Sequence, residues 1–583
     1  MPEKIVKQHY IALVKLLKIY RTAPLDRDLL QATLHFCKNL YGAAKAHPDL
    51  LFAQPQLYKS QLPFIVNLSF NSVVITCLLA ERNKFDPSVT IQLMCGSLSI
   101  CGLEQSSIEK HYQTVADNQK PTTTKIGQHN ATFVHLLKTS RQQVWLSSYL
   151  LGPHIHLSRY PQESLTSPLS ALTYMANKFA LLCTTNKQKQ SISFANAIKH
   201  LSLICCHKWY VLLMPLVDYP SVSPPGSYIR LRDNSVHMVL SLNNKGLVTK
   251  ALSNKQTIGM QSSETDIQVI TTDQVTKIYP CQQLNGFARL NHWWGTELNQ
   301  WLSSHQEHAP KVAFNLIQSI KTAPASLMVI QDQLNHVNAD IAVIIKAIEK
   351  EPLHAHQLLV SASSMNRNKQ PVRSIQHGLA MLGFERSNSI LLQYSLLARL
   401  NQQYFPLQQA LLTFNQFFVN IVAELATRTK LLSSEFASTT AYFAVSRLFT
   451  LPTIRSLKRW ETTTIPRFKL ASLIKAKESQ RLKHDGFMLA KTWHQNKQML
   501  EVLRDYDLVS PEQQKTSSTS QYCYVLGIGL ILAQEHYFLR TGHCEETEGY
   551  LKTGLHELGL SPATLTSMMT EVVARTNVFC QLD

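Results

Sequence analysis

Residues 372–386 read VRSIQHGLAMLGFER and carry the clearest structural signal in the chain. They lie in a half that, from Val312 almost to its end, repeats apolar side chains at the spacing of amphipathic helices. Polar breaks interrupt this pattern at 366–371 and 509–520. We therefore expect a mainly helical domain at 311–583.

Helical spacing also governs the first part of the chain. Apolar segment 62–79 is long, and its length favours a buried helix over a strand. The polar stretch 105–127 is typical of a surface loop. Together these patterns predict a second helical domain at 1–207, with its helices within 24–103, 131–150 and 167–204.

The pattern changes after Lys208. Residues 209–216 form a β-rich run, and Pro224-Pro225-Gly226 is typical of a tight turn. We expect a small β appendage at 208–275 and a connector at 276–310. The expected strands lie near 228–231, 236–242, 247–251 and 266–271. The fold class is therefore expected to be mainly α, with two multi-helix domains and a small β-hairpin appendage between them.

Composition limits the classes of protein. The 583 residues allow two to four domains, and 45% hydrophobic residues exclude wholesale disorder. With 19 glycines, glycine-rich phosphate loops are not expected. Lys and Arg number 57 against 38 Asp and Glu, a net charge of +19. Such a surface attracts anions, whether nucleotides, nucleic acid, acidic proteins or anionic lipid.

The cysteines and the N-terminal residues suggest a compartment. The 11 cysteines follow no regular spacing, which suits a reducing cytoplasm. The tightest cluster, Cys205-Cys206-His207, lacks a second ligand pair, so we favour a buried turn over a metal site. The N-terminal residues lack the apolar core of a signal peptide, and no run of 18 apolar residues occurs. We expect a cytoplasmic protein without a transmembrane segment.

The C-terminal half resembles the HDOD family of bacterial signalling proteins. Residues 372–386 match that family's pattern most specifically, with Leu382-Gly383 in register. Residues 323–329 with 339–348, and the stretch 351–362, are similar to its earlier helices. The resemblance covers roughly 311–583 and implies a multi-helix domain of the HD superfamily.

The N-terminal half resembles an HD-GYP phosphodiesterase-type domain over about 24–275. Residues 174–180 are similar to a helix of that family, and Arg159-Tyr160-Pro161 stands where it has Gly-Tyr-Pro. Residues 223–231 are similar to its proline-rich hairpin. The resemblance implies a second HD-superfamily-like domain.

The resemblance also locates the metal ligands that such a hydrolase needs. An HD hydrolase binds two divalent metals through a His-Asp pair and further histidines. In the N-terminal half the pair falls on Ser99-Ile100, and other ligand positions fall on Asn67, Asn177 and Leu151-Gly152, near His154 and His156. In the C-terminal half the pair falls on Phe449-Thr450. The chain's one His-Asp dipeptide, His484-Asp485, lies elsewhere. We therefore expect no catalytic, cofactor-binding or metal-binding residues, and no enzyme.

Charge gathers in one stretch of the C-terminal half. Residues 451–500 hold 11 basic and 3 acidic residues, a net charge of +8, whereas 501–583 hold 5 and 11, a net charge of −6. The basic stretch is either a solvated face or a docking surface for an anionic partner or the acidic tail of the same chain; nucleic acid is the least favoured partner. The expected partner-binding residues are Arg455, Lys458, Arg459, Arg467 and Lys469.

These observations predict a non-catalytic cytoplasmic signalling scaffold or regulator that acts through protein partners. One alternative is a metal-dependent cyclic di-GMP phosphodiesterase. The other is a non-catalytic receptor for a cyclic dinucleotide. A connector motif, His292-Trp293-Trp294, has aromatic rings of the kind that stack on a base, but packing against a domain is favoured.

Overall fold

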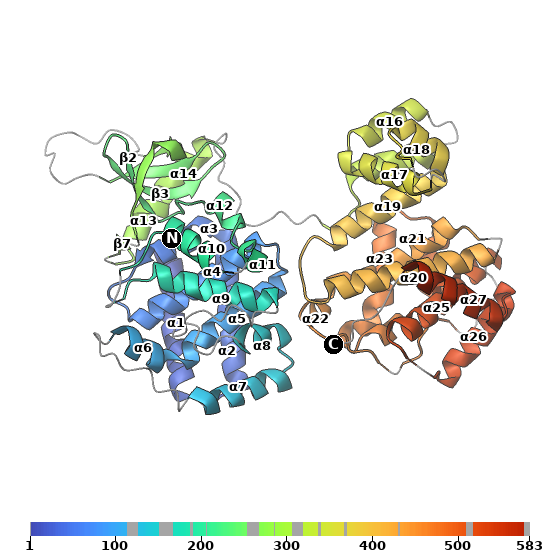
Figure 1. Ribbon diagram of the computed structural model, residues 1–583, viewed down its shortest axis with the longest axis horizontal. Helices are drawn as coiled ribbons and strands as arrows, with labels where there is room; N and C mark the ends of the chain where they lie inside the picture. Colours follow the sequence, from blue (N-terminus) through green and yellow to red (C-terminus); the bar gives the residue numbers. More distant parts are fainter. Residues whose placement is uncertain are drawn as a thin grey trace. The chain divides into compact units, whose positions relative to one another are not determined.

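The computed structural model forms two compact units, Met1–Leu316 (unit 1) and Ile317–Asp583 (unit 2) (Figure 1). Both are built mainly of helices, with a small antiparallel sheet in unit 1, and the predicted fold class is confirmed. The structure describes residues 2–113, 126–150, 167–186, 190–205, 207–252, 267–280, 282–284, 286–305, 319–335, 340–365, 370–429, 432–463, 465–508, 517–540 and 542–576.

Unit 1 is organised around helix α4 (Phe64–Arg82). This helix follows Pro63 and is apolar on all sides, so burial on every side stabilises it. Helices α5 (Pro87–Leu103) and α9 (Pro168–Cys183) pack against it. The buried helix predicted from 62–79 is thereby confirmed.

Among the residues that the structure describes, two helices are long and apolar enough to cross a membrane by length and composition. They are α4 and, in unit 2, α20 (Gln408–Arg428). The apolar window of α4 is 100% buried inside the protein and that of α20 is 56% buried. Core helices of soluble proteins pass the same test, so these helices are weak indications of a membrane span.

Shorter helices surround this core. Residues 105–113 form helix α6 rather than part of a loop, and the β-rich run at 209–216 holds parts of two short helices, α11 and α12. The strand prediction was wrong because a continuous apolar run does not distinguish strand from helix. The remaining helices of unit 1 are α1 (Pro2–Thr22), α2 (Arg27–Ala46), α3 (Pro48–Phe52), η1 (Gln54–Gln56), α6 (Gln105–Gln113), α7 (Ile126–Thr139), α8 (Gln143–Leu150), α10 (Phe194–Ile204), α11 (His207–Tyr210), α12 (Pro215–Asp218), η2 (Thr272–Gln274), α13 (Arg289–Trp294) and α14 (Thr296–Ser304).

The sheet of unit 1 has the strand order β5-β4-β3-β2-β6, with every neighbouring pair antiparallel. Before β2, the predicted turn places Gly226 at a φ of 87°, where an added Cβ would lie 2.7 Å from the Ala53 carbonyl oxygen. Only glycine suits that position. The strands are β2 (Tyr228–Leu231), β3 (Val236–Leu242), β4 (Leu247–Ala251), β5 (Ile267–Ile270) and β6 (Val275–Ile278), and β1 (Leu57–Tyr58) pairs in parallel with β7 (Gln282–Gln283).

Hydrogen bonds join the sheet to the helices. The carboxylate of Asp49, on α3, accepts hydrogen bonds from the Tyr219 hydroxyl at 2.8 Å and from Ser241 Oγ, on β3, at 2.5 Å. Trp294 Nε1 donates to the Leu240 carbonyl at 2.8 Å. In the stretch expected as a connector, α13 and α14 thus pack on the sheet, and their tryptophans are buried.

Unit 2 begins with a group of short helices, α15 to α18, at one end of the long helix α19 (Figure 1). Gly383 separates α18 from α19 at a φ of 75°, so the Leu382-Gly383 signature marks a helix boundary. Helix α20 packs against α21 and α25 in the larger part of the unit. The helices are α15 (Ala325–Asn335), α16 (Ile341–Glu349), α17 (Pro352–Met365), α18 (Ile375–Leu382), α19 (Phe384–Leu400), α21 (Ser434–Val445), η4 (Ser446–Thr450), α22 (Pro452–Arg455), η5 (Leu470–Leu473), η6 (Lys477–Arg481), α23 (Leu482–Thr492), α24 (Lys497–Asp505), α25 (Ser517–Tyr537), α26 (Glu545–Leu558) and α27 (Pro562–Thr576).

Candidate functional site

The positions that the family resemblance aligns with metal ligands in unit 1 lie on α4, α5 and α9. Asn177 of α9 is fully buried, and its Nδ2 donates to Ser97 Oγ at 3.0 Å and to the Thr173 carbonyl at 2.8 Å. Asn67 of α4 accepts a hydrogen bond from the Lys59 main-chain N–H and donates to the Lys59 carbonyl, both at 3.1 Å. Both amides therefore hold the backbone and neighbouring helices together.

The position of the His-Asp pair, Ser99-Ile100, is also occupied by structural contacts. Ser99 Oγ accepts from Trp145 Nε1 at 3.1 Å, donates to the Cys95 carbonyl at 2.8 Å and lies 2.9 Å from the Tyr20 hydroxyl. Burial raises the pKa of Tyr20 well above its ordinary value, so this hydroxyl stays protonated. Ile100 is fully buried and apolar.

Cys101 completes a group that we call the neutral polar core, consisting of Ser72, Ser97, Cys101 and Asn177. The thiol lies 3.8 Å from Ser72 Oγ and 4.0 Å from Asn177 Oδ1. Burial raises the pKa of Cys101 to about 12, so the thiol is neutral at physiological pH. The core thus offers hydroxyl, amide and thiol groups, and divalent metals prefer carboxylate, imidazole or thiolate ligands.

The described parts of both units contain no group of three or more His, Cys, Asp or Glu side chains that could hold a metal ion. Several predicted positions lie outside the described residues. These are Leu151-Gly152, His154, His156, Arg159-Tyr160-Pro161 and Cys206 of the Cys205-Cys206-His207 cluster.

In unit 2 the position of the His-Asp pair falls on η4. Phe449 is buried, and Thr450 Oγ1 accepts a hydrogen bond from Arg447 at 3.0 Å. The chain's actual His-Asp dipeptide lies on α23, where Asp485 forms an ion pair with Arg447 at 2.8 Å. The carboxylate of Asp485 therefore orients the guanidinium group of Arg447.

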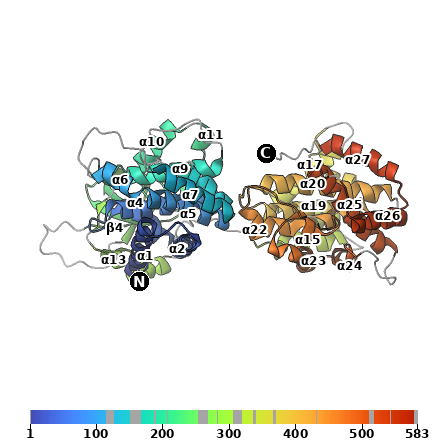
Figure 2. The same cartoon turned by 90° about the horizontal axis from the view of Figure 1, so that it is seen from below.

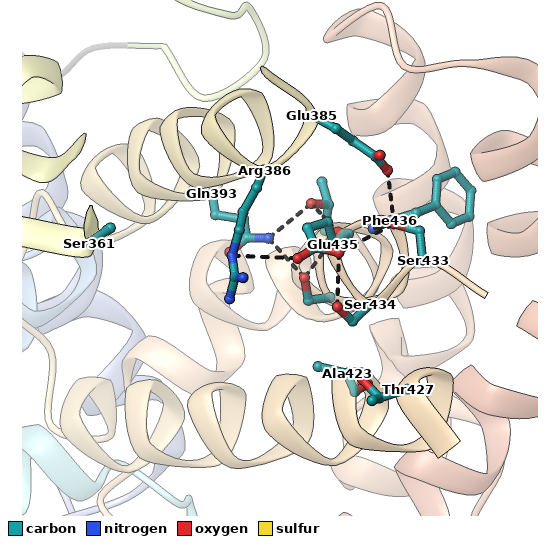
Figure 3. A network of polar contacts seen from close by, with 12 residues as sticks. Ser361, Glu385, Arg386, Gln393, Ala423, Thr427, Ser433, Ser434, Glu435 and Phe436 are labelled. Carbon is teal, nitrogen blue, oxygen red and sulfur yellow. Dashed lines mark hydrogen bonds and ion pairs between the residues drawn. The ribbon is translucent and has the colours of Figure 1, made fainter. Parts of the chain in front are cut away.

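The specific stretch 372–386 ends in a polar network between α19 and α21 (Figure 3). Arg386 Nε lies 3.5 Å from the Glu435 carboxylate, and Ser433 Oγ donates to Glu385 at 2.9 Å. Ser433 also caps α21, because its Oγ accepts from the Phe436 N–H at 3.2 Å. The conspicuous Glu385-Arg386 pair therefore ties two helices of unit 2 together.

Two of the five predicted partner-binding residues are turned toward the protein itself. Arg455 Nε donates to the Phe449 carbonyl at 2.7 Å, and its guanidinium lies 5.6 Å from the centre of the Phe405 ring. The side chain of Arg467 is only 12% exposed, and it contacts Glu535 at 3.5 Å and the Arg540 carbonyl at 3.3 Å. Carbonyl and carboxylate acceptors of unit 2 therefore engage both cations.

The basic stretch pairs in part with the acidic end of the same chain. Lys469 lies 3.5 Å from the Glu546 carboxylate, and Lys483 lies 2.6 Å from that of Asp507. Lys458 and Arg459 are exposed. Partial burial and the neighbouring Arg459 lower the pKa of Lys458. Lys458 and Arg459 are therefore the members of the predicted set that face solvent most openly.

Reasoning from sequence missed Asp49. Burial raises the pKa of this carboxyl to about 6. The hydrogen bonds from Ser241 and Tyr219 act in the opposite direction, but their effect on the pKa is smaller. No signal near Asp49 in the sequence could reveal this, because both partners lie far along the chain.

No protein-family model and no curated protein matches the sequence. Among solved structures, an HDOD domain protein of unknown function from Geobacter sulfurreducens matches with 15% identity and a TM-score of 0.33, over 49% of this chain and 96% of that chain. A protein from Marinobacter aquaeolei VT8 proposed to act in signal transduction matches with 16% identity and a TM-score of 0.34, over 49% of this chain and 64% of that chain. A protein from Shewanella amazonensis SB2B proposed to be a phosphohydrolase matches with 13% identity and a TM-score of 0.31, over 44% and 90%. The similarity to such signalling proteins thus covers about half of the chain, and no activity follows from it.

Proposed function

We propose that this chain is a non-catalytic cytoplasmic signalling scaffold or regulator, with an HDOD-like unit 2 and a degenerate HD-GYP-like unit 1, that acts through protein partners. The observation that carries the proposal is the neutral polar core of unit 1. At the positions where the resemblance implies metal ligands, Asn177 and Ser99 are already engaged in hydrogen bonds inside the helical core.

The chemistry supports the absence of hydrolysis. A metal-assisted attack on phosphorus requires ligands that carry negative charge or free imidazole nitrogens. Asn177 is neutral, and both hydrogens of its amide are used by Ser97 and the Thr173 carbonyl. Turning this side chain toward a metal would break two buried hydrogen bonds, each of which is costly to leave unmade.

For the partner surface, the proposal concerns an anionic protein surface that meets Lys458 and Arg459, with Arg455 adding to the local positive potential. Arg467 and Lys469 are paired with Glu535 and Glu546. Exposed ion pairs contribute only about 0–1 kcal/mol each, so several must act together. Their principal effect is on the association rate, which falls as added salt screens the charges.

The test uses the purified full-length chain. Elemental analysis should find no stoichiometric transition metal, and incubation with cyclic di-GMP and Mn²⁺ should yield no linear product. Two iron or manganese ions per chain together with hydrolysis would refute the proposal in favour of a phosphodiesterase. Equilibrium dialysis against cyclic di-GMP at two salt concentrations tests the receptor alternative. Stoichiometric binding that persists at the higher salt concentration would refute the scaffold function in favour of a nucleotide receptor.

A further inference from the structure

Helix α1 presents an exposed stripe of lysines and aliphatic side chains on unit 1. Its buried face is formed by Val6, Tyr10, Leu13, Leu16, Leu17 and Tyr20. The opposite face carries residues at the i, i+3, i+7, i+10, i+11 and i+14 spacing of one helix side. This outer face, which we call the lysine stripe, consists of Lys4, Lys7, Ile11, Val14, Lys15 and Lys18, all exposed.

The aliphatic members of the stripe are exposed to solvent. Ile11 is 47% exposed and Val14 is 41% exposed, and Ile19 at the edge of the stripe is 37% exposed. Single exposed aliphatic residues are common on protein surfaces. Here they lie between two pairs of lysines on one side of a helix, and among the residues that the structure describes no ion pair or hydrogen bond engages the four ammonium groups.

Acidic groups near the stripe are already bound to other parts of unit 1. Glu3 is the single acidic residue of α1, and its carboxylate accepts from Asn291 Nδ2 of α13 at 3.0 Å, while its N–H donates to Asn291 Oδ1 at the same distance. On α2, Asp26 caps the helix by accepting from the Leu29 N–H at 3.0 Å. The stripe therefore keeps its positive charge uncompensated.

The helix that carries the stripe is held firmly. Figure 2 shows α1 at an edge of unit 1 next to α2 and α13, both of which pack against it. Asn291 fixes its first turn, and an ion pair of 3.1 Å between Arg21 and Glu109 joins its last turn to α6. From Lys4 to Lys18 the stripe extends over roughly 21 Å at 1.5 Å per residue.

We propose that the lysine stripe docks unit 1 on an anionic lipid surface, with α1 lying in the plane of the membrane. Ile11 and Val14 would enter the boundary between headgroups and acyl chains, and the four lysines would extend along their aliphatic stems toward lipid phosphates. This role goes beyond the proposed scaffold, because it would fix where the protein acts whichever protein it binds.

The chemistry favours lipid over the other anions. Lysine is a point charge that suits a diffuse anionic surface, whereas nucleic acid and carboxylate partners are met preferentially by the planar fork of arginine. The stripe itself contains no arginine and no aromatic ring on which a base could stack. Exposed aliphatic groups between the cations make no favourable contact with a phosphate group. Their transfer from water to the lipid interface is favourable, because it removes apolar surface from water.

The experiment measures sedimentation of the full-length chain with lipid vesicles. Vesicles of phosphatidylcholine alone are compared with a two-to-one mixture of phosphatidylcholine and phosphatidylglycerol. Each lysine near an anionic surface contributes roughly a fivefold change in partition coefficient. The variant Lys4→Gln/Lys7→Gln/Lys15→Gln/Lys18→Gln should therefore bind the mixed vesicles several hundred-fold more weakly, with an unchanged circular dichroism spectrum.

A matched control removes the same charge elsewhere. It replaces four exposed lysines of unit 2 by glutamine, namely Lys346, Lys350, Lys491 and Lys552. Screening limits the reach of each charge to about 10 Å, so this control should bind nearly as the unaltered chain does. The variant Ile11→Ser/Val14→Ser should weaken the binding that remains at high salt.

Three outcomes would overturn the proposal. The first is absence of binding to the mixed vesicles. The second is an equal loss in the stripe variant and in the control, which would make the effect one of net charge alone. The third is binding of a short DNA duplex, but not of vesicles, that the stripe variant loses, which would assign the stripe to nucleic acid.

Discussion

Substituting Asn177 by aspartate tests whether the neutral polar core is a structural feature or a metal site lacking one ligand. Asn177, Ser97 and Thr173 are all fully buried. A carboxylate retains the contact with Ser97, since that hydroxyl can donate to it. It cannot donate to the Thr173 carbonyl, which lies 2.8 Å from the present amide nitrogen, so two acceptors would face each other.

The expected cost combines two effects. Loss of the hydrogen bond to Thr173 costs about 1–3 kcal/mol. Leaving an uncompensated charge in the core brings the total to roughly 3–5 kcal/mol in the free energy of unfolding at neutral pH. Burial raises the pKa of the new carboxyl above its ordinary value of about 4. The deficit should therefore be small below about pH 4, should grow from there up to the folded-state pKa and should be constant above it.

Urea denaturation of Asn177→Asp, with and without Mn²⁺, measures this change. We expect Mn²⁺ to leave both the variant and the unaltered chain unchanged. The control Ser97→Ala, which removes the hydrogen-bonding contacts of Ser97 with Asn177 and adds no charge, should cost about 1–3 kcal/mol and show little pH dependence. If Asn177→Asp is as stable as the unaltered chain at neutral pH, or gains stability with Mn²⁺ by ligand linkage, the core can hold metal and our reasoning is refuted.

Four further predictions concern stability, the basic stretch and the turn at Gly226. Burial raises the pKa of Asp49 to about 6, so as the pH rises this carboxyl ionises in the unfolded chain before it does in the folded one. The free energy of unfolding should therefore fall between about pH 4 and pH 6. The variant Asp49→Asn should flatten that part of the pH profile. Arg467→Gln should lower the free energy of unfolding by about 1–3 kcal/mol, since it leaves buried acceptors unsatisfied, and an unchanged urea midpoint would contradict the contacts described. By contrast, Lys458→Gln/Arg459→Gln should change stability by less than about 0.5 kcal/mol yet slow association with an anionic protein partner at low salt, as stopped-flow measurements would reveal. Gly226→Ala should destabilise by more than about 1 kcal/mol, because it combines a φ of 87° with a close main-chain oxygen; an unaltered melting temperature would show that the turn can move.

The sequence by itself determined the features that depend on near neighbours. The length of the largely apolar segment 62–79 predicted the buried helix α4, because a long segment of this composition favours a buried helix over a strand. The turn at Gly226 and the strands that follow were predicted from turn chemistry and alternation. The helix boundary at Gly383 also depends on local sequence, because a backbone conformation with positive φ favours glycine.

Tertiary structure decided the features that depend on distant partners. The run 209–216 holds short helices because packing, and not its apolar composition, selects between helix and strand. Nothing near Arg467 in the sequence indicates that it contacts Glu535, which lies 68 residues away. Likewise, the sequence identified Asn177 as neutral, but only the packing of α9 on α5 shows that Ser97, 80 residues away, uses its amide. Local patterns specify helices and turns, whereas the partner of a buried polar group is set by which elements the whole chain brings together.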